Sequence, residues 1–427
     1  MMEKLEMLKK YGWIMDALSK LPLSEKTRLV SNFLHAKKKY MPEREGNANV
    51  DYILKCGLCP NMCRFDCPVL QVIKTETVSP AVKSRLAYHL ETGMLPPSED
   101  LVKAIYDCCN CGSCQPWCPF DFIVGDLLKG VREDIAEMGK VPGHLLKFKE
   151  LIEREHTIYE GGRKSLGRES GAKEHRTNRK RFVRASTGTV FGHDVLYFAG
   201  CKVINKRPQV AHATLKLMEK AGVRCVTLPE EWCCGVPLGN IGFKEEFKKF
   251  AEHTAKAIAE SGAKTVVCSC PSCAVAFKEL YPGAGVKVKA DVMHSAEYLL
   301  GLVKSKKLKP GKLEGLFVYH DPCKLARKLE KADEPRELLA SIGKLELAEP
   351  QFSGKETHCC GRGGSYATIN PGVSGKITGN RLAELMEVSE RIITACPNCE
   401  LAFEGAASGG NGMEVSDIAE ILLKSME

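Results

Sequence analysis

Residues 108–119 read CCNCGSCQPWCP, a dense run of cysteines that indicates the fold of the N-terminal part of the chain. Cys108, Cys111 and Cys114 recur at every third position, and a fourth cysteine, Cys118, directly precedes a proline. This spacing brings three thiolates to one 4Fe–4S cubane, while the fourth cysteine points to a second cluster. The stretch therefore predicts a cluster-binding loop that needs a partner run elsewhere in the sequence.

The partner run lies upstream. It has the form Cys-x2-Cys-x3-Cys-x3-Cys-Pro, with one residue more than the standard between its second and third cysteines. Exchange of the fourth cysteines assigns one cubane to Cys56, Cys59, Cys63 and Cys118, and the other to Cys108, Cys111, Cys114 and Cys67. Zinc also binds Cys-x2-Cys pairs and is the alternative; two matched runs that both end in Cys-Pro favour iron–sulfur. Cys109 does not fit the spacing and is interpreted as a buried thiol.

Composition supports metal binding in a reducing compartment. The 427 residues include 21 cysteines, and a chain this long buries enough apolar surface to fold without disulfides. The formal charge of +9 does not indicate a nucleic-acid partner, because cluster thiolates would offset it. The sequence shows neither an apolar run long enough to span a membrane nor a secretory signal. We therefore expect a cytoplasmic protein, held on the inner face of the membrane only through a partner.

The second half of the sequence repeats itself. In each copy a single cysteine is followed after 31 or 35 residues by Cys-Cys-Gly, and after 35 more by Cys-x2-Cys. The first copy contributes Cys201, Cys233, Cys234, Cys270 and Cys273, and the second contributes Cys323, Cys359, Cys360, Cys396 and Cys399. Cys225 and Cys268 have no counterpart. Short β-branched runs alternate with longer helical patterns, which predicts a parallel α/β sheet in each copy. The runs are 195–199, 224–228 and 264–268 in the first copy, and 316–320, 344–348 and 391–395 in the second.

Five cysteines are one more than a cubane needs. A fifth thiolate implies either an opened cluster with a bridging ligand or a ligand that can leave, and either would let iron meet a substrate sulfur. The adjacent cysteines need a tight backbone turn, and Gly235 and Gly361 supply the freedom for it.

These motifs resemble those of a known family. Two ferredoxin-type runs followed by two Cys-Cys-Gly modules resemble the D subunit of heterodisulfide reductase and other CCG-domain proteins. The resemblance implies one or two noncubane 4Fe–4S clusters in the modules, and reduction of a small disulfide substrate there. The arrangement is also similar to the iron–sulfur subunits of glycolate oxidase and anaerobic glycerol-3-phosphate dehydrogenase, which relay electrons from a flavoprotein.

Two residues depart from the reductase pattern. Lys324 follows Cys323 where the reductase commonly has histidine, and Arg362 follows Gly361 where it has alanine. Lysine is a proton donor only if its pKa is lowered. Arg362 is a candidate to bind a carboxylate or sulfonate, or else to pair with a nearby acid. His320 and His358 lie beside module cysteines and are considered as proton carriers or cluster ligands, with a local hydrogen bond as the simpler role.

The sequence thus predicts an α+β multidomain protein. Its expected parts are a helical segment (1–55), a two-cluster ferredoxin-like domain (56–150), a basic Gly-rich linker (157–190), and two CCG modules (191–305 and 314–427). It has no flavin fingerprint, so other redox subunits are needed as partners. We expect these to be a cytochrome b-type membrane subunit, a flavoprotein dehydrogenase or an electron-transfer flavoprotein. The hypotheses are a disulfide-reducing oxidoreductase subunit or, as the alternative, a non-catalytic electron relay.

Overall fold

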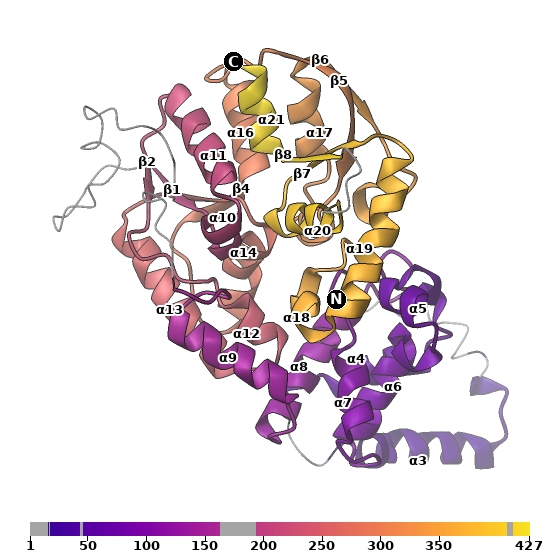
Figure 1. The fold of residues 1–427 in the computed structure, drawn as a ribbon. Coiled ribbons are helices and arrows are strands. Elements are labelled where there is room, and N and C mark those ends of the chain that lie inside the picture. The colour runs from indigo at the N-terminus through magenta and orange to yellow at the C-terminus, as the bar shows by residue number, and fades with distance from the viewer. Residues whose placement is uncertain (1–15, 17, 43–45, 163–193, 408–412) are drawn as a thin grey trace.

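The computed structural model describes residues 16, 18–42, 46–162, 194–407 and 413–427. Most of the helical pattern expected before residue 20, and residues 163–190 of the expected linker, lie outside the described residues. The described chain has three parts, which are an N-terminal helical part at the bottom of Figure 1 and two α/β modules above it. The expected fold class, a helical part followed by two modules with parallel sheets, is confirmed.

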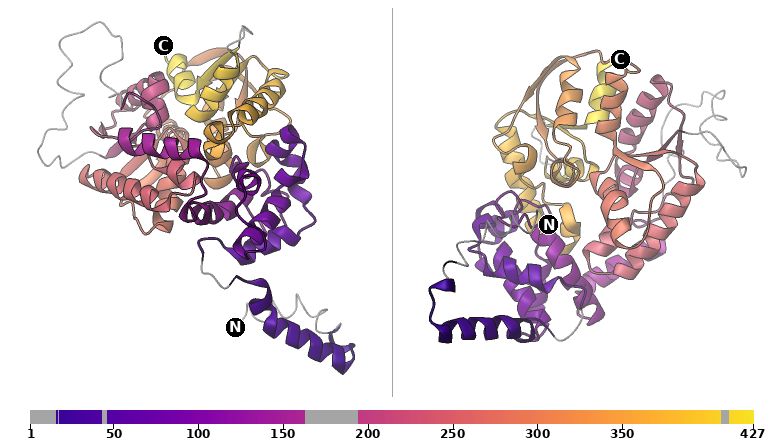
Figure 2. Two further views of the ribbon diagram at one scale, coloured as in Figure 1. Left: turned by 60° about the horizontal axis from the view of Figure 1, so that its bottom comes forward. Right: turned by 180° about the vertical axis from the view of Figure 1, so that it is seen from behind.

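Short helices around a small apolar core make up the N-terminal part. Its α-helices are α3 (Leu23–Tyr40), α4 (Val50–Leu58), α5 (Pro68–Ile73), α6 (Pro80–Glu91), α7 (Glu99–Tyr106), α8 (Val124–Glu137) and α9 (Gly143–Glu155). Two 3-10 turns, Met62–Asp66 and Glu76–Val78, join α4 to α5 and α5 to α6. Proline at the first turn of α5 and of α6 suits the helix start, where its missing N–H costs no hydrogen bond. Helix α3 lies apart from this core (Figure 2).

Each module contains one four-stranded parallel sheet. The first is ordered β2-β1-β3-β4, and the second is ordered β6-β5-β7-β8. The strands are β1 (Val195–Phe198), β2 (Cys225–Thr227), β3 (Thr265–Cys268), β4 (Asp291–His294), β5 (Lys312–His320), β6 (Gly343–Ala348), β7 (Arg391–Thr394) and β8 (Glu414–Asp417). Sequence periodicity missed β4 and β8. Their sequences, DVMH and EVSD, mix charged and apolar residues over four positions, so only pairing to the neighbouring strand defines them.

Helices cover both sheets. In the first module they are α10 (Cys201–Lys206), α11 (Pro208–Lys220), α12 (Val236–Asn240), α13 (Lys244–Glu260), α14 (Pro271–Val275), α15 (Tyr281–Gly283) and α16 (Ser295–Lys304). In the second they are α17 (Asp333–Ala340), α18 (Tyr366–Ile369), α19 (Pro371–Met386), α20 (Pro397–Ala407) and α21 (Ile418–Ser425). A π-helical turn follows α14 (Ala276–Leu280), and another follows β5 (Lys324–Lys328).

The two modules pack on each other with internal symmetry. Helix α11 of the first packs on α21 of the second, and α16 of the first packs on α17 of the second. Since α11 corresponds to α17 and α16 to α21 in the repeat, the contacts are reciprocal, as in a two-fold dimer. One apolar core runs through this interface and contains Leu217, Leu299, Leu338 and Leu422. The repeat is therefore folded as one body rather than as two independent domains.

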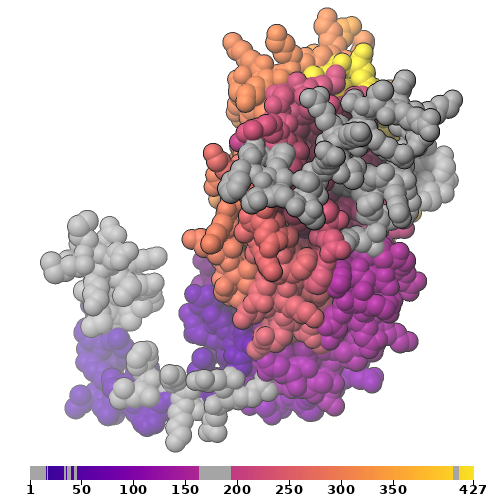
Figure 3. Space-filling view, turned by 90° about the vertical axis from the view of Figure 1, so that its left-hand side faces the viewer, coloured from indigo at the N-terminus to yellow at the C-terminus, as the bar shows by residue number. Residues whose placement is uncertain are grey.

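The helical part is fixed to both modules. The buried Tyr366 hydroxyl donates a hydrogen bond of 2.8 Å to the Asp107 carboxylate, and so joins the second module to the loop that follows α7. The buried Arg132 guanidinium of α8 donates one of 2.8 Å to the Asn240 carbonyl of the first module. Ile152 of α9 belongs to the apolar core of the first module, and the magenta surface that includes α9 borders that module in Figure 3. Cysteine loops from all three parts consequently meet in the interior.

Candidate metal centres

The first centre is a pocket in the helical part. A cavity is lined by Cys56, Cys59, Cys63 and Cys118, together with apolar and aromatic side chains. Burial raises the pKa of Cys56 to about 11 and that of Cys63 to about 12. Thiols gathered in such a site lose their protons only when a cation compensates their charge, so this donor set fits iron. The structure brings together the four cysteines that the sequence assigns to one cubane.

The second centre adjoins the first. A cavity is lined by Cys67, Cys108, Cys111 and Cys114, and also by Cys109. Backbone N–H groups already point at two of its sulfurs, with Val124 N at 3.4 Å from Cys114 Sγ and Asn110 N at 3.4 Å from Cys108 Sγ. Such N–H groups stabilise thiolates and therefore suit a bound cluster. Cys114 lines both cavities, which places the two centres side by side.

The second cavity also contains a buried lysine that the sequence motifs did not predict. Lys83 of α6 is 1% exposed, and its ammonium donates a hydrogen bond of 2.7 Å to the Asp107 carbonyl. Burial alone lowers the pKa of Lys83, but the neighbouring thiols of Cys67 and Cys108 raise it above its ordinary value. Lys83 therefore stays positively charged beside the site. A lysine within the amphipathic pattern of α6 gave no signal of this role, because the role depends on how the helix packs.

In the first module the five predicted cysteines form one connected group. Cys201 Sγ lies 3.9 Å from Cys233 Sγ, and Cys273 Sγ lies 3.5 Å from Cys234 Sγ. The fifth, Cys270, neighbours Cys273. All of them follow the carboxyl ends of strands, where parallel α/β sheets hold their ligands. Cys225 lies within β2 and Cys268 at the end of β3, and burial raises the pKa of each.

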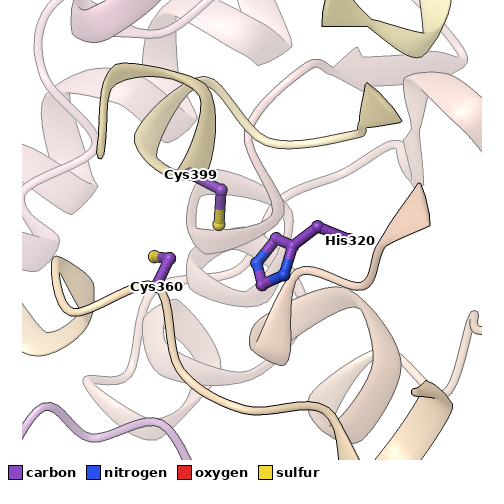
Figure 4. A group of neighbouring side chains, drawn as sticks. All are labelled: His320, Cys360 and Cys399. Carbon is purple, nitrogen blue, oxygen red and sulfur yellow. The ribbon is translucent and has the colours of Figure 1, made fainter. Parts of the chain in front are cut away.

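The second module arranges its five cysteines differently. Cys360 and Cys399 lie with His320 in a group whose donor atoms are within 4.8 Å of one another (Figure 4). The Cys359 thiol neighbours Cys360 on one side and two cysteines of the helical part, Cys109 and Cys111, on the other. Cys323 is buried close to Cys360, and Cys396 faces the first module.

The Cys-Cys-Gly turn requires its glycine, as expected from the sequence. Gly361 has φ +85°, and a Cβ there would lie 2.5 Å from the Ser374 carbonyl oxygen. The Thr378 hydroxyl donates a hydrogen bond of 2.8 Å to the Cys360 carbonyl and holds the turn from α19. In the first module Gly235 has φ +77° and is enclosed by Phe247 and Phe250. Both turns are therefore fixed by backbone geometry and by the helix behind them.

Cysteine contacts connect the four centres in a row. Cys359 of the second module neighbours Cys109 and Cys111, which line the second cavity of the helical part. At the other side of the module, Cys396 neighbours Cys270 of the first module. Cys270 and Cys396 are equivalent residues of the repeat, so this contact lies on the internal symmetry axis. The order is first cavity, second cavity, second module, first module.

Arg327 braces the contact between the second cavity and the second module. Its guanidinium is buried and donates to the Cys111 carbonyl at 3.0 Å, to the Thr357 carbonyl at 2.5 Å and to the Lys355 carbonyl at 2.7 Å. Contact with the Cys359 thiol and the charge of Arg327 lower the pKa of Cys111, although burial opposes this. The sequence offered no signal for this role beyond the position of Arg327 four residues after Cys323.

The two candidate cations of the second module have no acidic partner among the described residues. Within the described part of the chain neither Lys324 nor Arg362 forms an ion pair with a carboxylate, and Arg362 Nε is buried without a hydrogen-bond partner. The electrostatic neighbours of Tyr159 include both Arg362 and Lys202, and Lys202 follows Cys201 as Lys324 follows Cys323. Positive charge from both modules therefore gathers beside the cysteines of the first module.

The two candidate histidines have local partners. His358 stacks on Phe352 and lies between Glu384, 2.7 Å from its Nδ1, and Asp66 of the helical part, 3.3 Å from its Nε2. Burial alone lowers the pKa of His358, but these two carboxylates raise it to about 9. Burial lowers the pKa of His320 instead, so this ring is neutral at neutral pH.

Comparison with known proteins agrees with these sites. Residues 195–278 and 317–404 match the family model described as a cysteine-rich domain, CCG, and residues 52–122 match a 4Fe-4S dicluster domain. Among the described residues, no helix is both long enough and apolar enough to cross a membrane. The chain belongs to the CCG-domain iron–sulfur protein family and is homologous to the D subunit of heterodisulfide reductase, as the sequence motifs indicated.

Three relatives illustrate the range of the family. The D subunit of the dihydromethanophenazine:CoB--CoM heterodisulfide reductase of Methanosarcina mazei is 28% identical over 77% of this chain and 79% of its own length. The probable glycolate oxidase iron-sulfur subunit of Bacillus subtilis is 26% identical over 87% of this chain and 94% of its own. EtfAB:quinone oxidoreductase of Syntrophomonas wolfei is 30% identical over 76% of this chain and 47% of its own. The chain is thus an iron–sulfur electron-transfer protein.

Proposed function

We propose that the chain is the subunit of an oxidoreductase complex that delivers single electrons to the two CCG modules for thiol–disulfide chemistry. Its cofactors would be two 4Fe–4S cubanes in the helical part and one or two noncubane 4Fe–4S clusters in the modules. When bound, these clusters supply one-electron redox chemistry. The ligands would be the four cysteines of each cavity and the five cysteines of each module, as the sequence assigns them.

The observation that carries the proposal is the row of cysteine centres. Cys114 is shared by the walls of the two cavities, Cys111 and Cys359 join the second cavity to the second module, and Cys270 and Cys396 join the two modules. A protein that stored metal or used it only for stability would have no need to place four centres in line. This arrangement supports an electron path that begins at the first cavity and ends between the modules.

The cations between the modules support an anionic substrate. Cleavage of a disulfide consumes two electrons and two protons and releases two thiols. Lys202 and Arg362 would hold a carboxylate, sulfonate or phosphate group of such a substrate, because neither is paired with a carboxylate among the described residues. Lys324, the other candidate, follows Cys323 and contributes positive charge that opposes the rise in the Cys323 pKa caused by burial.

The alternative is a relay without chemistry of its own, between a flavin dehydrogenase or electron-transfer flavoprotein and a membrane cytochrome or quinone site. The name of the relative EtfAB:quinone oxidoreductase favours this role. The replacement of the reductase histidine by Lys324 also favours it, since an ordinary lysine is a poor proton donor at neutral pH. Both roles require a partner complex in the cytoplasm or on the inner face of the membrane.

One experiment separates the two roles. The protein is purified anaerobically from its native cells with its attached subunits, and its clusters are reduced with a viologen dye. Oxidation of the dye on addition of an anionic heterodisulfide, with release of two thiols per disulfide, supports the enzyme. If the clusters are intact and copurified subunits are present, but only a flavoprotein or a quinone exchanges electrons with the protein, the disulfide proposal is wrong and the relay holds.

A further inference from the structure

Equivalent positions of the two modules differ in one buried residue. The last residue of β1 is Phe198, and the last residue of β5 is His320; both stand three positions before the first cysteine of their module. Phe198 packs edge-on against Phe277 with ring centroids 4.9 Å apart, and His320 packs edge-on against Phe403 at 4.8 Å. The two rings therefore occupy the same place in the repeat. Only His320 can donate a hydrogen bond.

Arg381 fixes the tautomer of His320. Arg381 Nε donates to His320 Nδ1 at 3.3 Å, so Nδ1 carries a lone pair and the proton of the neutral ring is on Nε2. The guanidinium cannot turn away, because its other nitrogens donate to Glu384 at 2.7 Å and to the Phe352 carbonyl at 2.9 Å. Both His320 and Arg381 are 1% exposed, so water does not compete for these hydrogen bonds.

The protonated nitrogen faces the cysteines of the second module. His320 Nε2 is buried and has no hydrogen-bond partner among the described residues. Figure 4 shows the ring directed at Cys360 and Cys399, and the donor atoms of this group lie within 4.8 Å of one another. A nitrogen that binds iron must offer a lone pair, which Nε2 lacks in this tautomer. The geometry therefore favours a hydrogen-bond donor to sulfur over a metal ligand.

We propose that His320 donates an Nε2–H hydrogen bond to a thiolate of the second-module cluster and so makes that cluster easier to reduce than the first-module cluster. This inference rests on the proposed loading of the modules with clusters. Hydrogen bonds to cluster sulfurs raise the reduction potential, because they stabilise the extra negative charge of the reduced state. Phe198 provides no such bond in the first module.

The asymmetry gives the row of centres a direction. The cysteines of the second module lie next to those of the helical part, through Cys359 and Cys111, and the cysteines of the first module lie beyond them. With clusters bound, an electron from the helical part would reach the second module first; no bond would break, and the proton of His320 would stay on Nε2. The second module is thus reduced first, and the first module receives its electron afterwards.

The test is a redox titration of the anaerobic, cluster-loaded protein, monitored by electron paramagnetic resonance. His320→Phe gives the second module the residue of the first, and we expect one module signal to shift to lower potential while the cubane signals stay in place. His320→Gln keeps an N–H donor and is expected to restore part of the shift. The matched control, Phe198→His with His320→Phe, is expected to reverse the order in which the two module signals appear.

Several results would overturn the inference. Unchanged potentials in a fully loaded His320→Phe protein would do so. Strong hyperfine coupling from 15N-labelled histidine in the wild-type protein would also do so, because it indicates direct binding to iron. The 15N measurement on the wild-type protein tests whether His320 binds iron even if the variants fail to fold. Iron and sulfide analysis of the wild-type protein tests the loading separately, so failure of the proposed function is distinguishable from failure of this inference.

Discussion

Replacement of Arg327 by methionine tests how the helical part and the second module are joined. Methionine keeps most of the apolar stem but removes the guanidinium, which donates to three carbonyls. Two of these hydrogen bonds, to Cys111 and Thr357, are buried, so their acceptors are left without a partner. A buried acceptor that loses its partner costs about 1–3 kcal/mol. Loss of both buried hydrogen bonds predicts that Arg327→Met lowers the free energy of unfolding by about 2–6 kcal/mol.

The assay is anaerobic thermal unfolding of the cluster-loaded protein, followed both by circular dichroism and by loss of visible absorption. The matched control is Arg224→Met, which removes a guanidinium that is 62% exposed and pairs with Asp194 at 3.0 Å. Exposed pairs of this kind contribute about 0–1 kcal/mol, so the control is expected to melt close to the wild type. If Arg327→Met melts together with Arg224→Met, the guanidinium does not join the two parts as described.

Single substitutions test the charge, the ligands and the protonation of the centres. Lys83→Met is expected to lower the reduction potential of one cubane, because the buried cation beside Cys67 and Cys108 stabilises the reduced, more negative state. Lys103→Met, on the exposed face of α7, is the control. Equal reduction potentials in the two variants would contradict the placement of Lys83 beside the cluster. Cys118→Ser is expected to disturb only the cubane of the first cavity, although Cys118 belongs to the run that supplies Cys108, Cys111 and Cys114 to the second cavity. Loss of the second-cavity signal in electron paramagnetic resonance would instead refute the exchange of fourth cysteines. His358 should make stability depend on pH, since Asp66 and Glu384 raise its pKa to about 9 against the effect of burial. Protonated His358 contributes fully to the free energy of unfolding below pH ~6.5, and this contribution is lost as the pH rises through about 9. The stability advantage of the wild type over His358→Gln should therefore shrink across that range. A constant difference would show that the ring does not titrate as inferred.

The sequence predicted the parts of this molecule that local spacing controls. The runs that end in Cys118-Pro119 and Cys67-Pro68 assign four cysteines to each of two sites. The four assigned to each site line one cavity, although Cys114 also lines the first cavity and Cys109 the second. The β-branched runs predicted six of the eight strands in the described residues. The missed pair, β4 and β8, are defined by their neighbours rather than by their own composition.

Sequence patterns did not predict the roles of residues that depend on packing between distant segments of the chain. Lys83 and Arg327 look like ordinary helix and turn cations until the folded chain buries them beside cysteines of another segment. The contact of Cys109 with Cys359 joins residues 250 positions apart, and the spacing rules identified Cys109 only as a residue outside the motif. The difference between Phe198 and His320 matters because the fold packs the two rings in the same way, against Phe277 and Phe403.

The modules are inferred to hold clusters in addition to those of the helical part. The most direct test is the iron and acid-labile sulfide content of the anaerobically purified protein, per chain. Two cubanes alone contribute about eight atoms of each, so we expect clearly more than eight of both. A brown protein that stops at about eight, or a colourless protein that contains zinc, would contradict it.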